Sequence, residues 1–198
     1  MGPVAGESRL SPRLFLVAPE LPAARLAECI AAACAAGDVA SLLVPPSLAR
    51  ELAPLAQAKG IAVLTTGDPR NAARLGCDGI HVDAATEPVA EARASAGQDR
   101  IVGAFAGASR HLAMEAAEAG ADYIAFSQNA RAPGGEPIVA WWSELFEVSC
   151  VAFDPVEPEG LDILLPQNPD FIRPSDAMWE SSAEARRIIA ALMRHLGP

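Results

Sequence analysis

The sequence predicts an α/β fold, a closed (β/α)8 TIM barrel in a single domain, from three observations. Short apolar runs recur along the chain at spacings of about one βα unit. Alanine-rich helical segments lie between most of them. No break in composition divides the 198 residues, and this length suits one domain with a sizeable core. An open, doubly wound sheet is the rival architecture at this stage.

Eight apolar runs predict the strands. Each run is short and nearly unbroken, which is typical of parallel strands that are covered on both faces. The expected strands are Leu14–Ala18, Val39–Val44, Ile61–Thr65, Gly79–Val82, Ile101–Phe105, Asp122–Phe126, Ser149–Phe153 and Asp170–Arg173. The last strand has the weakest pattern, because Pro174 ends it early. Residues 1–13 are expected to form an N-terminal extension, and residues 14–198 the barrel domain.

A repeated unit supports the alternation of helix and strand. Three alanine-rich segments are each followed by a glycine, then by an aspartate, and then by an apolar run. The glycines are Gly37, Gly76 and Gly120, and the aspartates are Asp38, Asp78 and Asp122. We expect the glycines to end their helices in the left-handed conformation. The aspartates precede strands, at the end of the barrel away from the ligand face, so we interpret them as structural.

Amphipathic patterns predict the helices between the strands. The expected helices are Leu21–Ala36, Ser109–Ala119, Ala140–Phe146 and Ala183–Leu196. The third of these contains Trp141 and Trp142, which we interpret as packing residues rather than a stacking platform for a ligand.

The charge of the chain limits its partners. The formal net charge is −10, the isoelectric point is about 4.7, and there is no run of Lys or Arg. Such a surface repels phosphate backbones, so no nucleic-acid partner is expected. A small phosphorylated ligand is compatible with this negative charge, because a few arginines or helix N-termini can form a local positive site. Lys59 is the only lysine, which disfavours Schiff-base chemistry and a P-loop.

The cysteines and the apolar stretches indicate a cytoplasmic protein without a membrane partner. None of the four cysteines forms a C-x-x-C motif or a zinc-spaced Cys/His pair. We therefore expect buried, reduced thiols. No stretch reaches the ~18 apolar residues of a membrane span, and the first residues lack the apolar core of a signal peptide.

Polar residues at strand ends are the candidates for function, because a barrel of this kind binds its ligands there. His81 lies near the end of the fourth strand and Asp83 follows it. A buried histidine with one hydrogen bond is the alternative for His81, and a helix N-cap or loop aspartate is the alternative for Asp83. Ser127, Gln128 and Asn129 follow the sixth strand, where loop capping and ligand recognition are both open.

The segment "GCDGIHVDAATEP", followed by "RIVGAF" and "AEAGADYIAFS", resembles the thiamine phosphate synthase family, which includes the TenI-type proteins. The opening "RLFLVAPE" is similar to the first strand of that family. The resemblance spans Leu14 to about Phe126 and is thin afterwards. It implies a (β/α)8 barrel and a transferase of thiamine biosynthesis. That reaction joins hydroxymethylpyrimidine diphosphate to thiazole phosphate and releases pyrophosphate, with Mg²⁺ as cofactor. The protein is also a possible homodimer.

The strand-end motifs of the family are largely replaced in this chain. Its cationic Q-x-R-x-K group corresponds to "SLLVPPS" (Ser41–Ser47), and its G-Q-E-D corresponds to Asp83-Ala84-Ala85-Thr86. Its Asn-Asp pair corresponds to Thr66-Gly67, with Asp68 one position later. The motifs after strands five, six and seven become "FAGAS", "NARAPGG" and "AFDPVEP".

Three functional interpretations follow from this pattern. The first is a thiamine phosphate synthase-like enzyme, if it is active. The second is a catalytically degenerate barrel of the same family that binds a ligand without turnover. The third is a different enzyme that uses His81 as a base. No catalytic residue is assigned.

The resemblance and the strand ends together give the candidate site residues. The candidates for binding a small phosphorylated heterocycle are His81, Asp83, Ser127, Gln128, Arg131, Arg173 and Ser175. Asp68 and Asp83, with Glu87 nearby, are weak candidates for a shifted magnesium site, since Mg²⁺ needs only one or two carboxylates besides substrate phosphates. If an anion site is retained, we expect Arg173 and the N–H groups that open the last helix, near Ser175 and Asp176, to form it.

Overall fold

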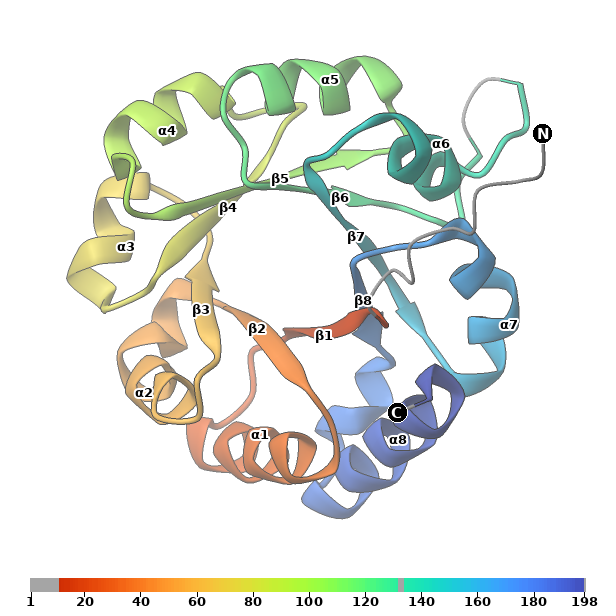
Figure 1. Cartoon of the computed structure of the whole chain (residues 1–198). Coiled ribbons are helices and arrows are strands. Elements are labelled where there is room, and N and C mark those ends of the chain that lie inside the picture. Colours follow the sequence, from red (N-terminus) through yellow and green to blue (C-terminus); the bar gives the residue numbers. More distant parts are fainter. Residues whose placement is uncertain (1–10, 132–133, 198) are drawn as a thin grey trace.

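The eight strands close into a parallel barrel in sequence order. The computed structural model describes residues 11–131 and 134–197. Strand β1 pairs with β2 on one side and with β8 on the other, which closes the sheet. The helices form a ring around the strands (Figure 1). The predicted (β/α)8 barrel is confirmed, and the open sheet is excluded. The N-terminal extension falls mostly on residues 1–10, outside the described residues, and stays a prediction.

All eight expected strands are present. They are β1 Arg13–Val17, β2 Val39–Val44, β3 Ala62–Thr65, β4 Gly79–Asp83, β5 Ile101–Gly107, β6 Tyr123–Phe126, β7 Ser149–Val156 and β8 Phe171–Pro174. The main difference is that β7 runs on to Val156, where it meets Pro174 of β8 after a break in register.

The α-helices follow the strands. They are α1 Ala23–Ala36, α2 Pro46–Gln57, α3 Pro69–Leu75, α4 Val89–Ala96, α5 Arg110–Glu118, α6 Ile138–Leu145, α7 Leu161–Leu164 and α8 Ser182–Leu196. Three short 3₁₀ turns occur late in the chain, η1 Pro158–Gly160, η2 Leu165–Gln167 and η3 Asp176–Trp179. Strand β8 therefore does not lead directly into the last helix. The expectation that this helix opens near Ser175 and Asp176 is wrong, because η3 comes between and Ser181 caps α8.

The side chains of the strands separate into two environments. Outward-facing residues such as Leu16 and Ile124 pack against the helices in large buried clusters. Trp142 belongs to one of these clusters, is fully buried and donates to the carbonyl of Val148 at 2.7 Å, in agreement with its interpretation as a packing residue. Inward-facing residues, among them Phe15 and Tyr123, fill the centre of the barrel.

The glycines of the repeated unit have two different roles. Gly76 and Gly120 follow α3 and α5 with φ of 78° and 92°, as expected for left-handed stops. The same expectation is wrong for Gly37, whose φ of −166° is extended. A Cβ at Gly37 would lie 2.7 Å from side-chain carbons of Ile189 and Met193. Glycine is needed there because α8 packs closely on this turn.

Three of the aspartates that precede strands bind the backbone of the neighbouring strand. The carboxylate of Asp78 accepts from the N–H of Val63 at 2.7 Å, while its own N–H donates to the carbonyl of Val63. Asp122 binds Val102 in the same two ways. Asp170, which precedes β8, repeats this arrangement at Cys150. These residues extend the strand ladder at the N-terminal end of the barrel, which agrees with the structural role predicted for Asp78 and Asp122. Asp38, the third aspartate of that prediction, pairs with the Arg13 guanidinium instead.

None of the helices in the described ranges has both the length and the apolar character required to cross a membrane.

Candidate functional site at the barrel mouth

The C-terminal ends of the strands form the mouth of the barrel, and most of the predicted site residues lie there. Asp83 is the last residue of β4 and is exposed. His81 lies two residues earlier, in the middle of the strand, and only 6% of its surface is exposed. The expectation of a histidine at the rim is therefore corrected: His81 points into the barrel below the rim.

His81 is joined to Tyr123 across an intervening strand. Its Nδ1 lies 2.7 Å from the Tyr123 hydroxyl. His81 on β4 and Tyr123 on β6 both pair in register with Gly103 of β5. A Cβ at Gly103 would lie 1.9 Å from Tyr123 Cζ. The absence of a side chain at Gly103 thus lets the tyrosine ring cross the middle strand and reach the histidine.

Aromatic rings surround this pair and form what we call the aromatic floor of the mouth: Phe15, His81, Phe105, Tyr123 and Phe153. The His81 ring stacks on Phe153, with a centroid distance of 5.1 Å and an interplanar angle of 18°. Phe105 contacts Phe153 at 5.4 Å, and Phe15 lies edge-on to Tyr123 at 5.5 Å. The floor fills the centre of the barrel, and Phe105 and Phe153 are its partly exposed members.

The buried pair is uncharged at neutral pH. Burial lowers the pKa of His81 to about 4, against the opposing effect of the Asp83 carboxylate. Burial also raises the pKa of Tyr123. A neutral imidazole and a neutral phenol can share a hydrogen bond in an apolar setting without the cost of burying a charge. As a general base at neutral pH, His81 would be a weak one, because its conjugate acid is too acidic.

Asp83 organises the loop that follows β4. Its carboxylate accepts from the N–H of Ala85 at 2.9 Å, and its carbonyl accepts from the N–H of Glu87 at 2.8 Å. The Glu87 carboxylate in turn accepts from the N–H of Asp83 at 3.2 Å. Asp83 is thus a loop aspartate at the rim, and its role toward a ligand stays a prediction.

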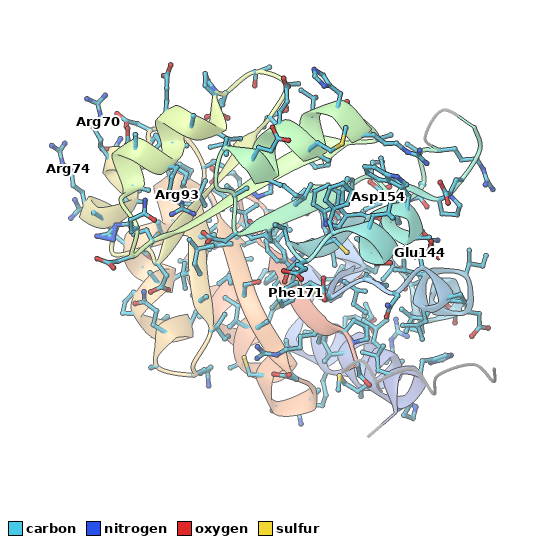
Figure 2. The ribbon with its side chains drawn as sticks, turned by 45° about the horizontal axis from the view of Figure 1, so that its top comes forward. Arg70, Arg74, Arg93, Glu144, Asp154 and Phe171 are labelled. Atoms are coloured by element: carbon cyan, nitrogen blue, oxygen red, sulfur yellow. The ribbon has the colours of Figure 1, made fainter. Side chains whose placement is uncertain are left out.

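Asp68 caps the helix after β3. It accepts from the N–H of Arg70 and forms an ion pair with the Arg70 guanidinium at 3.1 Å. The hydrogen bonds from Arg70 lower the pKa of Asp68. Arg70 and Arg74 project from α3 away from the barrel (Figure 2).

Within the described residues, the side chains alone do not form a complete magnesium site. Residues 11–131 and 134–197 contain no group of three or more His, Cys, Asp or Glu side chains placed to hold a metal. Both carboxylate oxygens of Asp68 are engaged by Arg70. Asp83, the other candidate, has one oxygen committed to its loop. A metal bound here would need ligands that these two side chains do not offer in their present contacts.

The polar cluster after β6 is held by Asp154 of β7. The Asp154 carboxylate accepts from the Ser127 hydroxyl at 2.9 Å and from the N–H of Asn129 at 3.0 Å. Gln128 bonds the backbone of Asp154 in both directions, at 2.8 Å each. Of the two interpretations that the sequence left open, these contacts support loop capping (Figure 2 labels Asp154). Asp154 itself was missed, although "FDP" at the end of a predicted strand was a signal.

Arg173 lies over the aromatic floor. Its guanidinium carbon is 5.4 Å from the centroid of Phe153, and its Nη1 donates to the Phe153 carbonyl at 3.3 Å. Its Nη2 contacts both carboxylate oxygens of Asp176, at 2.8 and 2.9 Å. The Nε atom is buried, and residues 11–131 and 134–197 offer it no hydrogen-bond partner. The side chain is only 17% exposed, and Asp176 supplies the carboxylate that pairs with its charge.

The remaining phosphate candidates are also engaged. The Ser175 hydroxyl caps η3 and bonds the Glu157 carboxylate. Arg131 is exposed on the loop after β6, and its Nη1 donates to the carbonyl of Gly135 at 2.9 Å. The neighbouring residues 132 and 133 of the "NARAPGG" segment lie outside the described residues.

The fold and this mouth define a (β/α)8 barrel whose candidate site lies at the C-terminal ends of the strands. The thiamine monophosphate synthase family matches residues 14–165, and the chain belongs to this family. The thiamine-phosphate synthase of Rhodospirillum centenum is 36% identical over 200 residues, which cover 92% of this chain and 96% of that protein. The thiamine-phosphate synthase of Erythrobacter litoralis is 36% identical, with coverage of 82% and 70%.

Solved structures support the same fold. A thiamine phosphate pyrophosphorylase from Pyrococcus furiosus superposes with a TM-score of 0.76 at 17% identity, covering 96% of this chain and 98% of that one. A 3-hexulose-6-phosphate synthase from Salmonella typhimurium superposes with a TM-score of 0.65 at 14% identity, covering 92% and 99%. At these identities the likeness establishes the barrel alone.

Proposed function

We propose that this chain keeps the binding face of a thiamine phosphate synthase and turns over slowly or not at all. By family, the reaction is the joining of hydroxymethylpyrimidine diphosphate to thiazole phosphate. The observation that carries the proposal is the pairing of charges at the mouth. Arg173 is matched by Asp176, and Asp68 is matched by Arg70.

Release of pyrophosphate requires positive charge that is already in place. A preorganised donor or cation stabilises the departing group, and the loss of one such donor costs about 10²–10³ in rate. The segment that corresponds to the family's cationic group, Ser41–Ser47, covers the end of β2 and the residues after it and contains no cation. This chain is therefore expected to bind and orient the substrates but not to neutralise the departing pyrophosphate.

The aromatic floor supports the binding half of the proposal. Phe153 and Phe105 are both partly exposed at the mouth. A flat heterocycle can stack on such rings with little loss of conformational entropy. The neutral His81 supports Phe153 from within the barrel. The candidates for polar contacts lie around it: Asp83 at the end of β4, and Ser127, Gln128 and Arg131 on the loop after β6. Ligands of this class are the pyrimidine and thiazole heterocycles of the family reaction.

A fully active synthase is the second candidate. The 36% identity to the Rhodospirillum centenum protein over nearly the whole chain favours it. In that case a bound diphosphate would have to displace Asp176 from Arg173.

One assay separates the two candidates. The chain and the Rhodospirillum centenum enzyme, as positive control, are given both substrates with Mg²⁺, and thiamine phosphate is measured. We expect turnover at least 10³-fold below the control, because several charged groups are missing at once. Turnover near the general enzyme median of ~10 s⁻¹ would reject the degenerate interpretation in favour of the synthase.

Binding is measured separately by calorimetry with hydroxymethylpyrimidine and with thiazole phosphate. Asp176→Asn removes the carboxylate charge that matches Arg173, so we expect thiazole phosphate to bind about tenfold more tightly, in line with the strength of one charge-assisted hydrogen bond. Arg173→Ala is expected to abolish that gain when the two changes are combined. If Asp176→Asn leaves the affinity unchanged, Arg173 does not contact the phosphate. If the wild type binds neither compound, the binding half of the proposal fails.

A further inference from the structure

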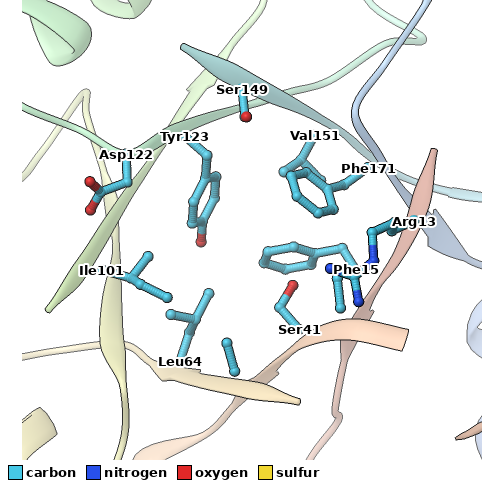
Figure 3. Close-up of a pocket in the computed structure, with 12 residues that line it drawn as sticks. Arg13, Phe15, Ser41, Leu64, Ile101, Asp122, Tyr123, Ser149, Val151 and Phe171 are labelled. Atoms are coloured by element: carbon cyan, nitrogen blue, oxygen red, sulfur yellow. The ribbon is translucent and has the colours of Figure 1, made fainter. Parts of the chain in front are cut away.

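The N-terminal end of the barrel, opposite the mouth, contains a pocket of about 270 Å³. It is lined by residues at or near the starts of the strands, which converge there (Figure 3). The rings of Phe15 and Tyr123, which belong to the aromatic floor, line the same pocket from the inside. The floor therefore separates two spaces, the mouth above and this N-terminal pocket below.

The walls of the N-terminal pocket are mainly apolar. Phe15, Leu64, Val151 and Phe171 supply aliphatic and aromatic surface. The pocket is larger than the ~150 Å³ of an engineered apolar cavity that binds benzene, and it is below the usual size of a drug-binding site. Its volume suits one aromatic ring or two fused rings.

Two hydroxyl groups line the pocket without a hydrogen-bond partner in the described part of the chain. Ser41 on β2 is 8% exposed, and Ser149 opens β7. Among the described residues, neither side chain makes a hydrogen bond, and both oxygens point toward the space enclosed by the walls (Figure 3). Both oxygens are accessible from the pocket and are not among the buried, unsatisfied atoms, so a ligand group that bonds either hydroxyl would replace water there and fix the orientation of the ligand.

The charged groups at the edge of the pocket are already matched. Arg13 forms two hydrogen bonds with Asp38, at 2.6 and 2.9 Å. Asp122 is bound by Arg93 and by the N–H of Val102. Neither an anion nor a cation would find an uncompensated partner here, so the pocket favours a neutral ligand.

We propose that the N-terminal pocket is a second binding site, which takes a small neutral aromatic molecule with one hydrogen-bonding group. Phenol and indole have this chemistry: the ring packs against Phe15 and Phe171, and the O–H or N–H bonds the hydroxyl of Ser41 or Ser149. The proposal concerns the face away from the mouth and does not depend on the proposed function.

The chain provides its own probe for this site. Tyr123 is the only tyrosine in the sequence, and its ring lines the pocket. Protein with ¹³C-labelled tyrosine rings therefore gives signals from one residue at the site. Indole is titrated while these signals are followed, with benzoate and benzylamine as charged comparisons of similar size.

We expect a saturable shift with indole and at least tenfold weaker binding of both charged compounds. Ala62→Leu places a larger side chain in the pocket and should weaken indole binding at least tenfold. Ala31→Leu, the same change at an exposed position of α1, and Arg173→Ala at the mouth should leave it unchanged. The pair Ser41→Ala and Ser149→Ala, combined in one chain, should weaken phenol severalfold and leave toluene unaffected.

Several results would overturn the proposal. One is the absence of any shift in the Tyr123 signals at indole concentrations up to the solubility limit. Another is binding that survives Ala62→Leu, which would place the ligand elsewhere. Loss of binding in Arg173→Ala would place it at the mouth. If Ala62→Leu does not fold, the Ser41→Ala and Ser149→Ala pair tests the proposal instead. The hydroxyl contacts would be rejected if this pair weakened the binding of phenol and toluene equally, or if it weakened neither.

Discussion

The two ends of the barrel use aspartate in different ways. At the N-terminal end, Asp78, Asp122 and Asp170 each bind both backbone groups of one residue in the preceding strand. At the mouth, Asp83 and Asp154 bind the N–H groups of loops. The same side chain therefore extends the sheet at one end and shapes loops at the other.

This difference explains why acidic residues at the mouth are not by themselves a metal site. A carboxylate whose oxygens already accept hydrogen bonds has less to offer a cation than its sequence position suggests. At the N-terminal end the matching of charge is similar, but there it surrounds a pocket with apolar walls. The two ends thus differ in the surface that lies between their charged groups. That surface consists of partly exposed rings at the mouth and of an open, mainly apolar pocket at the N-terminal end.

The aromatic floor between the two ends should give the largest effect when it is disturbed. In Gly103→Ala the new Cβ would lie 1.9 Å from Tyr123 Cζ, so the tyrosine or the strand must move. We expect the free energy of unfolding to fall by about 3 kcal/mol, at the upper end for overpacking, in a denaturant titration.

The double change Gly103→Ala with Tyr123→Ala tests the cause. If the clash with the ring is the reason, the combined loss is smaller than the sum of the two single losses. Additive losses would mean that the glycine matters for another reason.

His81 should make the stability of the protein depend on pH. Its pKa is about 4 in the folded protein and 6.5 in the unfolded chain, because burial disfavours the imidazolium. The unfolded chain therefore binds more protons between these values, and stability falls as the pH falls through this window. We expect a loss of about 2 kcal/mol between pH 6.5 and 5 from this residue.

Denaturant titrations across this range would measure the slope. His81→Gln should flatten it, even if that variant is less stable at pH 7. His111→Gln is the matched control, since His111 is exposed on α5. A slope that is the same in wild type and His81→Gln would remove His81 as its cause.

The comparison of the two kinds of aspartate includes the smallest expected effect. Asp122→Ala leaves the N–H of Val102 and the guanidinium of Arg93 without their partner, and we expect it to cost about 1–3 kcal/mol of stability. Asp83→Ala removes one exposed loop hydrogen bond and should cost about 0.5 kcal/mol. Equal losses in thermal unfolding would contradict the distinction between the two ends of the barrel.

The sequence by itself determined the fold. Apolar runs of strand length between alanine-rich helices leave few arrangements that bury every strand on both faces, and the family resemblance selected the barrel among them. Gly76 and Gly120 were predictable as helix stops because left-handed backbone favours glycine. The structural role of Asp78 and Asp122 was likewise predictable from their position before a strand.

The tertiary structure decided which polar groups are available to bind a ligand. Arg173 looked like a phosphate ligand in the sequence, but η3 brings Asp176 onto it. Ser127 and Gln128 looked like recognition residues, and Asp154, 27 and 26 residues away along the chain, holds them.

The N-terminal pocket and the His81–Tyr123 bond were equally invisible in the sequence. His81 and Tyr123 are 42 residues apart and meet only because Gly103 lies between them on the middle strand. The physical reason is common to all these cases. Local patterns fix the backbone through short-range propensities and burial, whereas the partner of a side chain depends on which distant residues the register of the closed barrel places beside it.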